Sequence, residues 1–246
     1  MMSSKALRMS FFLAVLFFLS SCNGSEEKTD TDKMSSDTSV TTAVETPAPS
    51  TINTTPQHMM IVKHKVANYE KFKAAYDVHD SLRLANGVHN YVIGRGVDDP
   101  NMVLVAVKAD DMDKAKAFAK SPGLKQAMQK SGVVGTPTVE FTTMTYQDSE
   151  VINSDIRSET VFTVKDWNAW QTAFAEGKQE RIDNGITVRA YGHDADDNNK
   201  VRLVVAITDS AKATAYWKSD MLKERRVKGG VIGEPKRFLF RVVQRY

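Results

Sequence analysis

Basic and aromatic side chains alternate along two neighbouring segments in the second half of the chain, with a weaker version of the pattern in the first half. The candidate ligand-binding residues in these segments are His89, Tyr91, Arg189, Tyr191, His193 and Arg202. Alternate residues of a strand point to one face, so these side chains would share a surface. Such a surface suits an anionic, partly apolar small molecule. The alternative is a solvated rim that binds nothing, because unpartnered buried arginines are costly.

Two further arginines, Arg83 and Arg181, occupy equivalent positions 98 residues apart. A guanidinium group presents a planar fork of donors that can grip a carboxylate or another anion. These arginines are therefore candidate ligand-binding residues. The alternative is an ordinary salt bridge to a nearby acid such as Asp98 or Asp196, which would contribute little to stability.

The histidines do not form a metal site by their spacing. They are His58, His64, His79, His89 and His193. No two of them have the helical spacing of paired ligands, and none pairs with a cysteine. We therefore predict no metal and no cofactor; if haem were bound, His79 would be the first residue to test. The acidic segments 98–101 and 196–199 lack the spacing of a calcium loop and are typical of hairpin turns.

The one cysteine, Cys22, follows a short positive segment and an unbroken apolar run at 11–19. The run is shorter than the ~20 residues that span a bilayer, and the order of its parts is typical of a secretory signal. The ending Leu19-Ser20-Ser21-Cys22 resembles the bacterial lipobox. This resemblance implies cleavage before Cys22 and lipid on its thiol. We expect an exported protein that a lipid anchors to a membrane, most simply the outer membrane; the alternative is an ordinary signal peptide with a chance cysteine.

Residues 22–56 are rich in Ser, Thr, Asp, Glu and Pro, with few large apolar residues. Such a composition is typical of a disordered tether. Its acidic start resembles the export signal of surface lipoproteins of the Bacteroidetes, although a plain solvated linker has the same composition. The predicted organisation is a signal peptide at 1–21, a tether at 22–56, two folded repeats at 57–148 and 159–246, and a linker at 149–158.

The two folded parts are copies of one unit. Asn86-Gly87 recurs as Asn184-Gly185, and the same offset of 98 residues relates Val66 to Val164, Gly94 to Gly192 and Pro137 to Pro235. Self-similarity at a fixed offset, with no gap over such a length, indicates duplicated structural units.

Each copy predicts the element order β-α-β-β-α-β, the ferredoxin-like arrangement. In the first copy we expect strands at 58–66, 88–95, 102–109 and 139–146, and helices at 69–85 and 111–120, with a short third helix starting at Pro122. Asn68 and Asp166 are suitable N-caps. The aromatic stripes on the first helix of each copy are Tyr69, Phe72 and Tyr76, and Trp167, Trp170 and Phe174. Helical spacing favours a core role for these stripes over a ligand pocket.

This element order, the duplication and the phrase from Ser121 to Pro137 resemble the dimeric α/β-barrel superfamily, which includes antibiotic-biosynthesis-type monooxygenases. The resemblance implies an α+β fold in which two tandem ferredoxin-like units pack sheet to sheet inside one chain. It also implies a monomer with an internal pseudo-dimer. Members include metal-free oxygenases, haem-degrading enzymes and proteins without known chemistry, so the fold does not select a function.

The leading functional prediction is a membrane-anchored exported lipoprotein that binds a small molecule in a fused α/β barrel. The alternatives are a cofactor-free monooxygenase-like enzyme and a structural or partner-binding module. Net charge is only +3, and this mild basic bias does not indicate nucleic-acid binding. The fingerprints of hydrolases, kinases and dinucleotide-dependent enzymes do not occur.

Overall fold

The computed structural model describes residues 50–246. The predicted signal peptide, Cys22 and most of the predicted tether lie outside the described residues. Among the described residues, no helix has the length and apolarity needed to cross a membrane. A two-residue strand, β1 (Ile52–Asn53), pairs with the end of the first repeat, so the C-terminal end of the predicted tether lies against the folded part.

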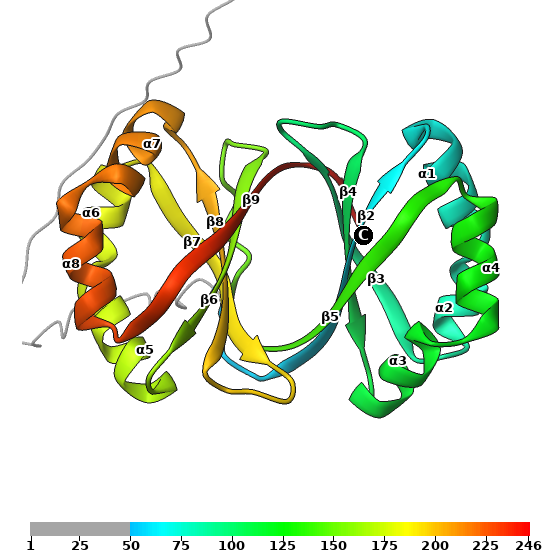
Figure 1. The fold of residues 1–246 in the computed structure, drawn as a ribbon, viewed down its shortest axis with the longest axis horizontal. Helices are drawn as coiled ribbons and strands as arrows, with labels where there is room; N and C mark the ends of the chain where they lie inside the picture. The colour runs from blue at the N-terminus through cyan, green and yellow to red at the C-terminus, as the bar shows by residue number, and fades with distance from the viewer. Residues whose placement is uncertain (1–49) are drawn as a thin grey trace, which may run out of the picture. The chain divides into compact units, whose positions relative to one another are not determined.

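Both repeats have the predicted order of elements (Figure 1). The first repeat comprises β2 (Gln57–Val66), α1 (Tyr69–Val78), α2 (Asp80–Leu84), β3 (Val88–Gly96), β4 (Met102–Ala109), α3 (Met112–Ala119), α4 (Pro122–Lys130) and β5 (Val133–Asp148). The second repeat comprises β6 (Ile156–Val164), α5 (Trp167–Glu176), α6 (Lys178–Asp183), β7 (Ile186–Asp194), β8 (Lys200–Ile207), α7 (Ser210–Lys218), α8 (Asp220–Lys228) and β9 (Val231–Arg245). The linker is shorter than predicted, because β6 begins at Ile156.

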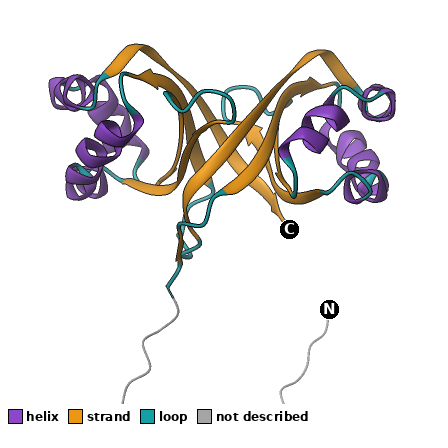
Figure 2. Cartoon of the chain, turned by 90° about the horizontal axis from the view of Figure 1, so that it is seen from below, coloured by secondary structure: helices purple, strands orange, loops and turns teal. Residues whose placement is uncertain are grey.

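The strands of the two repeats join into one closed barrel. Their order is β5-β2-β4-β3-β9-β6-β8-β7, and β7 pairs with β5 to close the ring. The helices of each repeat cover the outside of their own sheet, on opposite sides of the barrel (Figure 2). The predicted α+β fold of two ferredoxin-like units packed through their sheets is therefore confirmed.

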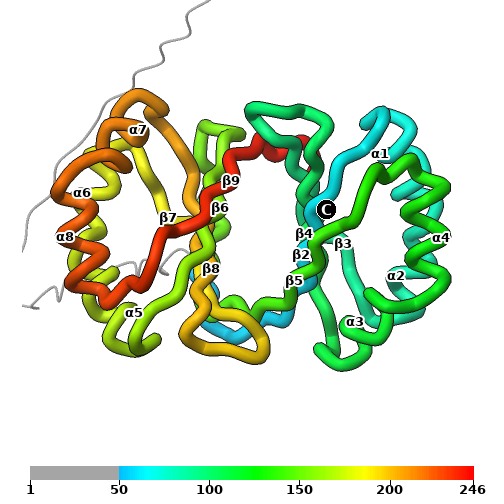
Figure 3. Tube along the Cα trace, viewed as in Figure 1, coloured from blue at the N-terminus to red at the C-terminus, as the bar shows by residue number. Residues whose placement is uncertain are grey.

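The last strand of each repeat makes this closure. β5 and β9 are 16 and 15 residues long, and each extends from its own sheet to the edge of the other repeat (Figure 3). The prediction placed only 139–146 in the last strand of the first repeat, and the strand is longer at both ends; it includes Gly135 and Pro137.

The local signals that start and end the first helices behave as predicted. The side chain of Asn68 accepts a hydrogen bond from the amide of Lys71 at 2.8 Å, and Asp166 caps α5 in the same way. Gly87 and Gly185 have φ values of 65° and 68°, the left-handed conformation that glycine adopts without strain. The predicted helix 69–85 is divided at His79, whose ring nitrogen Nδ1 lies 2.6 Å from the carbonyl oxygen of Ala75.

Each sheet has one face under its helices and one face in the barrel. Val103, Val105 and Val107 alternate along β4, so their spacing predicts a shared face, and they pack under the helices of the first repeat. Leu104 and Ala106 point into the barrel. The aromatic stripes also pack under the helices, with Phe72 and Trp170 buried.

A bulge in β3 and an equivalent one in β7 shift the alternation by one residue. The bulge in β7 lies between Val188 and Ala190, so the residues after it change faces. Tyr191 and His193, predicted to point into the barrel, therefore lie on the face covered by helices. Their ring centroids are 5.6 Å from Trp170 and 5.1 Å from Trp167, respectively. In β3 the same shift places Ile93 under the helices, where the prediction had it in the barrel.

Candidate functional site

The inside of the barrel contains a cavity of about 920 Å³. This volume lies within the range of about 300–1,000 Å³ that is typical of small-molecule sites. Its wall is largely apolar and comes from both repeats. Representative apolar residues of the wall are Met59, Ile61, Leu104, Met144, Val204 and Phe240.

Arginines and the inter-repeat linker form a polar part of this cavity. Arg157, Arg189 and Arg245 all line it, beside linker residues 149–155. Arg189 donates from Nη2 to the carbonyl oxygen of Glu150 at 2.6 Å, and its Nη1 is 3.6 Å from Asp148 Oδ2. This Nη1 is buried and makes no hydrogen bond among the described residues, so its contact with Asp148 is a long ion pair. An acid group that bound closer could add the hydrogen bond that Asp148 does not accept.

Arg157 is the most buried of these arginines, with 5% of its surface exposed. Its Nη1 donates to the carbonyl oxygens of Ser154 and Ile156 at 2.8 and 2.9 Å. Burial, together with the positive charges of Arg245 and Arg189, lowers the pKa of Arg157 to about 10. Asp155 acts against this shift, and Asp148, Glu150 and Glu159 also line the cavity, so acidic side chains accompany the arginines in this part of the wall.

A buried ionic cluster joins the two repeats elsewhere in the barrel. Lys63 Nζ lies 2.7 Å from Glu159 Oε2 and 3.3 Å from Glu140 Oε2. Arg202 lies 2.8 Å from Glu140, pairs with Glu159 and donates from Nε to Thr142 Oγ1 at 3.1 Å. Lys200 extends the cluster, because it lies 3.9 Å from Glu140 and 3.0 Å from Asp194. Arg202 is therefore occupied by protein carboxylates and does not line the barrel cavity, although its partner Glu159 does.

The charge state of this cluster follows from its burial and its pairing. Burial opposes ionisation of Glu140, but Arg202 and Lys63 outweigh it and lower the pKa of that carboxyl. Burial also lowers the pKa of Lys63, while Glu140 acts against that shift. Breaking such a pair leaves an uncompensated buried charge. The cluster therefore acts as a structural connection between the repeats.

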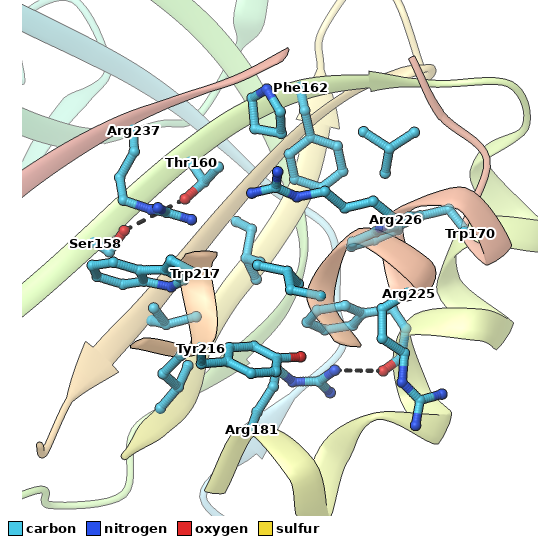
Figure 4. Close-up of a pocket in the computed structure, with 18 of the residues that line it drawn as sticks. Ser158, Thr160, Phe162, Trp170, Arg181, Tyr216, Trp217, Arg225, Arg226 and Arg237 are labelled. Carbon is cyan, nitrogen blue, oxygen red and sulfur yellow. Dashed lines mark hydrogen bonds between the residues drawn. The ribbon is translucent and has the colours of Figure 1, made fainter. Parts of the chain in front are cut away.

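A second, smaller cavity of about 110 Å³ lies between the sheet and the helices of the second repeat. Trp170, Trp217 and Tyr216 line it together with several arginines (Figure 4). The predicted ligand residue Arg181 is one of them. Its guanidinium carbon lies 3.7 Å from the centroid of the Phe174 ring, and Nη1 donates to the Phe174 carbonyl oxygen at 2.8 Å.

The equivalent cavity of the first repeat is about 60 Å³ and almost wholly apolar. Arg83 repeats the geometry of Arg181, because it stacks on Tyr76 at 3.7 Å and donates to the Tyr76 carbonyl oxygen at 2.8 Å. Arg83 also pairs with Asp80 at 3.3 Å, so its acidic partner is a helix residue and not the expected Asp98. Burial lowers the pKa of His64, which also lines this cavity, to about 4.

Haem does not fit the histidine-containing cavity. Both His64 and His79 line the cavity of the first repeat, but its volume of about 60 Å³ is far below that of a pocket for a large ligand. The residues that line the barrel cavity include no histidine. Among the described residues, no cluster of histidine and acidic side chains has the geometry of a metal site.

The predicted ligand residues therefore divide among several places. Tyr91 and Arg189 line the barrel cavity, Arg181 lines the cavity in the second repeat, and Arg83 lines the one in the first. His89 is half exposed and its Nε2 lies 2.9 Å from Asp110, so it joins neither cavity of its repeat. Arg189, His193 and Arg202, which were predicted to share one face, do not line one cavity: Arg189 lines the barrel cavity, and His193 and Arg202 do not.

Four arginines that line the cavities were not predicted from the sequence. Arg157 and Arg245 belong to the barrel cavity, and Arg226 and Arg237 belong to the cavity of the second repeat. A comparison of the two copies position by position would have indicated two of them, because Met128 and Val139 stand where the second copy has Arg226 and Arg237.

No family model matches the chain. No curated protein matches it either. Several solved structures are similar to the chain in fold. A candidate chlorite dismutase superposes with a TM-score of 0.54 and 13% identity, over 77% of this chain and 96% of its own.

Two other solved structures agree with this result. An anthrone oxidase-like protein has a TM-score of 0.53 and 13% identity, over 80% of this chain and 95% of its own. A candidate monooxygenase from Fusobacterium nucleatum subsp. nucleatum has a TM-score of 0.51 and 15% identity, over 77% of this chain and 93% of its own. The chain has the dimeric α/β-barrel fold. In this fused α/β barrel, one chain supplies both halves, and likeness at such low identity concerns the fold alone.

Proposed function

We propose that the fused barrel binds a small molecule with an apolar body and an acid group in its interior. The observation that carries this proposal is the cavity of about 920 Å³, whose largely apolar wall includes arginines. An apolar ligand body would remove apolar surface from water, and its acid would partner Arg189. A purely structural barrel would have a filled interior instead.

A pair of probes that differ only in the head group tests this proposal. We expect the mature chain, residues 22–246 with Cys22→Ser to remove the lipid, to bind dodecanoate more tightly than dodecan-1-ol in isothermal titration calorimetry. Arg189→Gln should weaken dodecanoate binding about tenfold, as expected for one charge-assisted hydrogen bond of about 1.5 kcal/mol, and should leave dodecan-1-ol binding unchanged.

The matched control is Arg95→Gln, which removes the same charge outside the cavity. Arg95 stacks on Tyr69 at 4.2 Å in the first repeat. Equal affinities for the acid and the alcohol, or an equal loss in both variants, would contradict the role of Arg189. Absence of binding by either probe would overturn the proposed ligand class.

We also propose that lipid on Cys22 anchors the chain on the outer membrane. The support is the lipobox-like Leu19-Ser20-Ser21-Cys22. Wild-type protein should fractionate with the outer membrane and take up labelled palmitate in the host, whereas Cys22→Ser should take up none. Palmitate labelling that persists in Cys22→Ser would rule out this site.

The barrel further supports a monomeric protein. The edges β3 and β7 that would pair with a second subunit already pair with β9 and β5 of the same chain. Light scattering of the mature chain should give the mass of one chain, and a stable homodimer would contradict this expectation.

A further inference from the structure

The cavity under α5–α8 has acquired cationic side chains that its counterpart in the first repeat lacks. Five polar residues of this cavity have apolar counterparts in the first repeat; they are Ser158, Thr160, Arg225, Arg226 and Arg237. Their equivalents 98 residues earlier are the apolar residues Met60, Val62, Ala127, Met128 and Val139. In the first repeat these side chains pack in or against the core. The same position in the fold therefore holds a small apolar cavity in one copy and a larger cavity lined by arginines in the other.

Arg237 is the most unusual of these side chains. Its guanidinium carbon lies 3.9 Å from the centroid of the Trp217 ring, and its Nε is buried without a hydrogen-bond partner among the described residues. Burial and the neighbouring Arg226 lower the pKa of Arg237 to about 10. No carboxylate of the described residues contributes to this shift, so within residues 50–246 no nearby acid balances the positive charge of Arg237.

Arg225, by contrast, is already paired. Its Nη2 lies 2.9 Å from Glu180 and its Nη1 lies 3.6 Å from Glu176. Glu180 also accepts a hydrogen bond from Tyr216 at 2.6 Å. Arg181 also lines the cavity, but it stacks on Phe174, donates to the Phe174 carbonyl oxygen and lies near Glu180. Arg226 and Arg237 are therefore the cations available to a ligand.

The chemistry of the walls defines the ligand. A guanidinium group that is buried without a counterion is costly, and a carboxylate or phosphate removes that cost through two parallel hydrogen bonds. The indole rings of Trp170 and Trp217 offer flat apolar walls. The volume of about 110 Å³ approaches that of the cavity of about 150 Å³ that binds benzene in another protein.

We propose that this cavity is a second binding site, separate from the barrel interior, for a single-ring aromatic molecule with an acid group. The acid group lies against Arg226 and Arg237, and the ring lies against Trp170 and Trp217. The first repeat has no such site, because apolar side chains fill the equivalent positions.

The tryptophans provide the measurement. All 3 tryptophans of the chain, Trp167, Trp170 and Trp217, belong to the second repeat. Phenyl phosphate and benzoate should change the tryptophan fluorescence of the mature chain saturably, with phenol as the uncharged control having no effect at the same concentrations. No saturable change with either acid at millimolar concentration would overturn the proposal.

Substitutions then locate the site. Arg237→Gln should weaken phenyl phosphate binding at least tenfold, and Arg95→Gln, with the same change in charge, should leave it unchanged. Circular dichroism and thermal unfolding check that Arg237→Gln folds; if it does not, Arg226→Gln should give the loss in a folded protein. Equal affinity in the wild type, the folded arginine variant and Arg95→Gln would overturn the proposal.

The two sites are distinguished by their probes. Arg237→Gln should leave dodecanoate binding unchanged, and Arg189→Gln should leave phenyl phosphate binding unchanged. If both variants weakened both probes equally, the two cavities would be one site and the proposal of a separate site would be wrong.

Discussion

The two repeats place the same pair of side chains in the same geometry but surround it with different chemistry. Arg83 stacks on Tyr76 and Arg181 on Phe174, both at 3.7 Å. Around Arg83 the cavity is small and apolar, whereas around Arg181 it is larger and contains further arginines. One backbone therefore supports either a small apolar cavity or a larger cavity lined by arginines, and the side chains that differ between the copies decide which.

The same difference occurs inside the barrel. The first repeat contributes Ile61 and Leu104, and the second has Glu159 and Arg202 at the equivalent positions. Both carboxylate and guanidinium are more than nine-tenths buried. The pair is tolerated because Lys63 and Glu140, which come from the first repeat, complete it. The interface between the repeats is therefore asymmetric in charge although it is symmetric in topology.

The largest expected effect on stability comes from replacing Arg202 with leucine, the residue at the equivalent position 104 of the first repeat. Arg202→Leu leaves Glu140 and Glu159 without their shared guanidinium partner, so the free energy of unfolding should fall by about 3–5 kcal/mol. Urea denaturation measures this change. The control Leu104→Met conserves volume and should cost less than about 1.5 kcal/mol; a similar cost for both variants would show that the ionic cluster is not needed.

A second prediction concerns His64, which corresponds to Phe162 in the second repeat. His64 is 4% exposed, and burial lowers its pKa from 6.5 to about 4. Above pH 6.5 the imidazole is neutral in both states. Below it the unfolded chain binds a proton that the folded chain does not, so stability falls until about pH 4, by about 3 kcal/mol.

The variant His64→Phe isolates this contribution. The part of the loss of stability between pH 7 and pH 4 that comes from His64 should be absent in this variant. The substitution also removes two buried ring nitrogens that lack partners among the described residues. Urea denaturation at several pH values gives the difference. Parallel pH profiles of the wild type and the variant would contradict the buried neutral histidine.

The smallest expected effect concerns glycines at the two places where strands of different repeats pair, β5 with β7 and β3 with β9. A Cβ atom on Gly192 would lie 2.1 Å from the backbone oxygen of Thr143, whereas on Gly94 it would meet the ring of Phe240. A ring can rotate and the backbone of a paired strand cannot. Gly192→Ala should therefore cost about 2–3 kcal/mol and Gly94→Ala about 1 kcal/mol, as measured by thermal unfolding. The reverse order would place the tighter junction at β3 and β9.

Much of the fold followed from local patterns. The offset of 98 residues, the caps at Asn68 and Asp166, and the alternation of Val103, Val105 and Val107 predicted the two units and their element order. These signals are local, because a helix cap or a strand pattern depends on residues a few positions apart.

The side chains of β7 that point into the barrel were predicted less well, and the reason is physical. A bulge adds one residue to a strand and reverses every side chain after it, and no residue type marks this event in 186–194. Arg189 is the extra residue in β7 and lies in the barrel, whereas Tyr191 and His193 turn to the helices. The pairing of Arg202 with Glu140 could not be predicted from the sequence either, because Glu140 lies in the other repeat.

The duplication, the ferredoxin-like order of elements and the core face of each helix can be predicted from the sequence, since these depend on spacing along the chain. The crossing of β5 and β9 to the other repeat, the cavity in the barrel and the division of the arginines between two cavities become visible in the folded chain. Those features depend on contacts between residues far apart in the sequence, and a bulge or a long strand changes them without changing the local pattern.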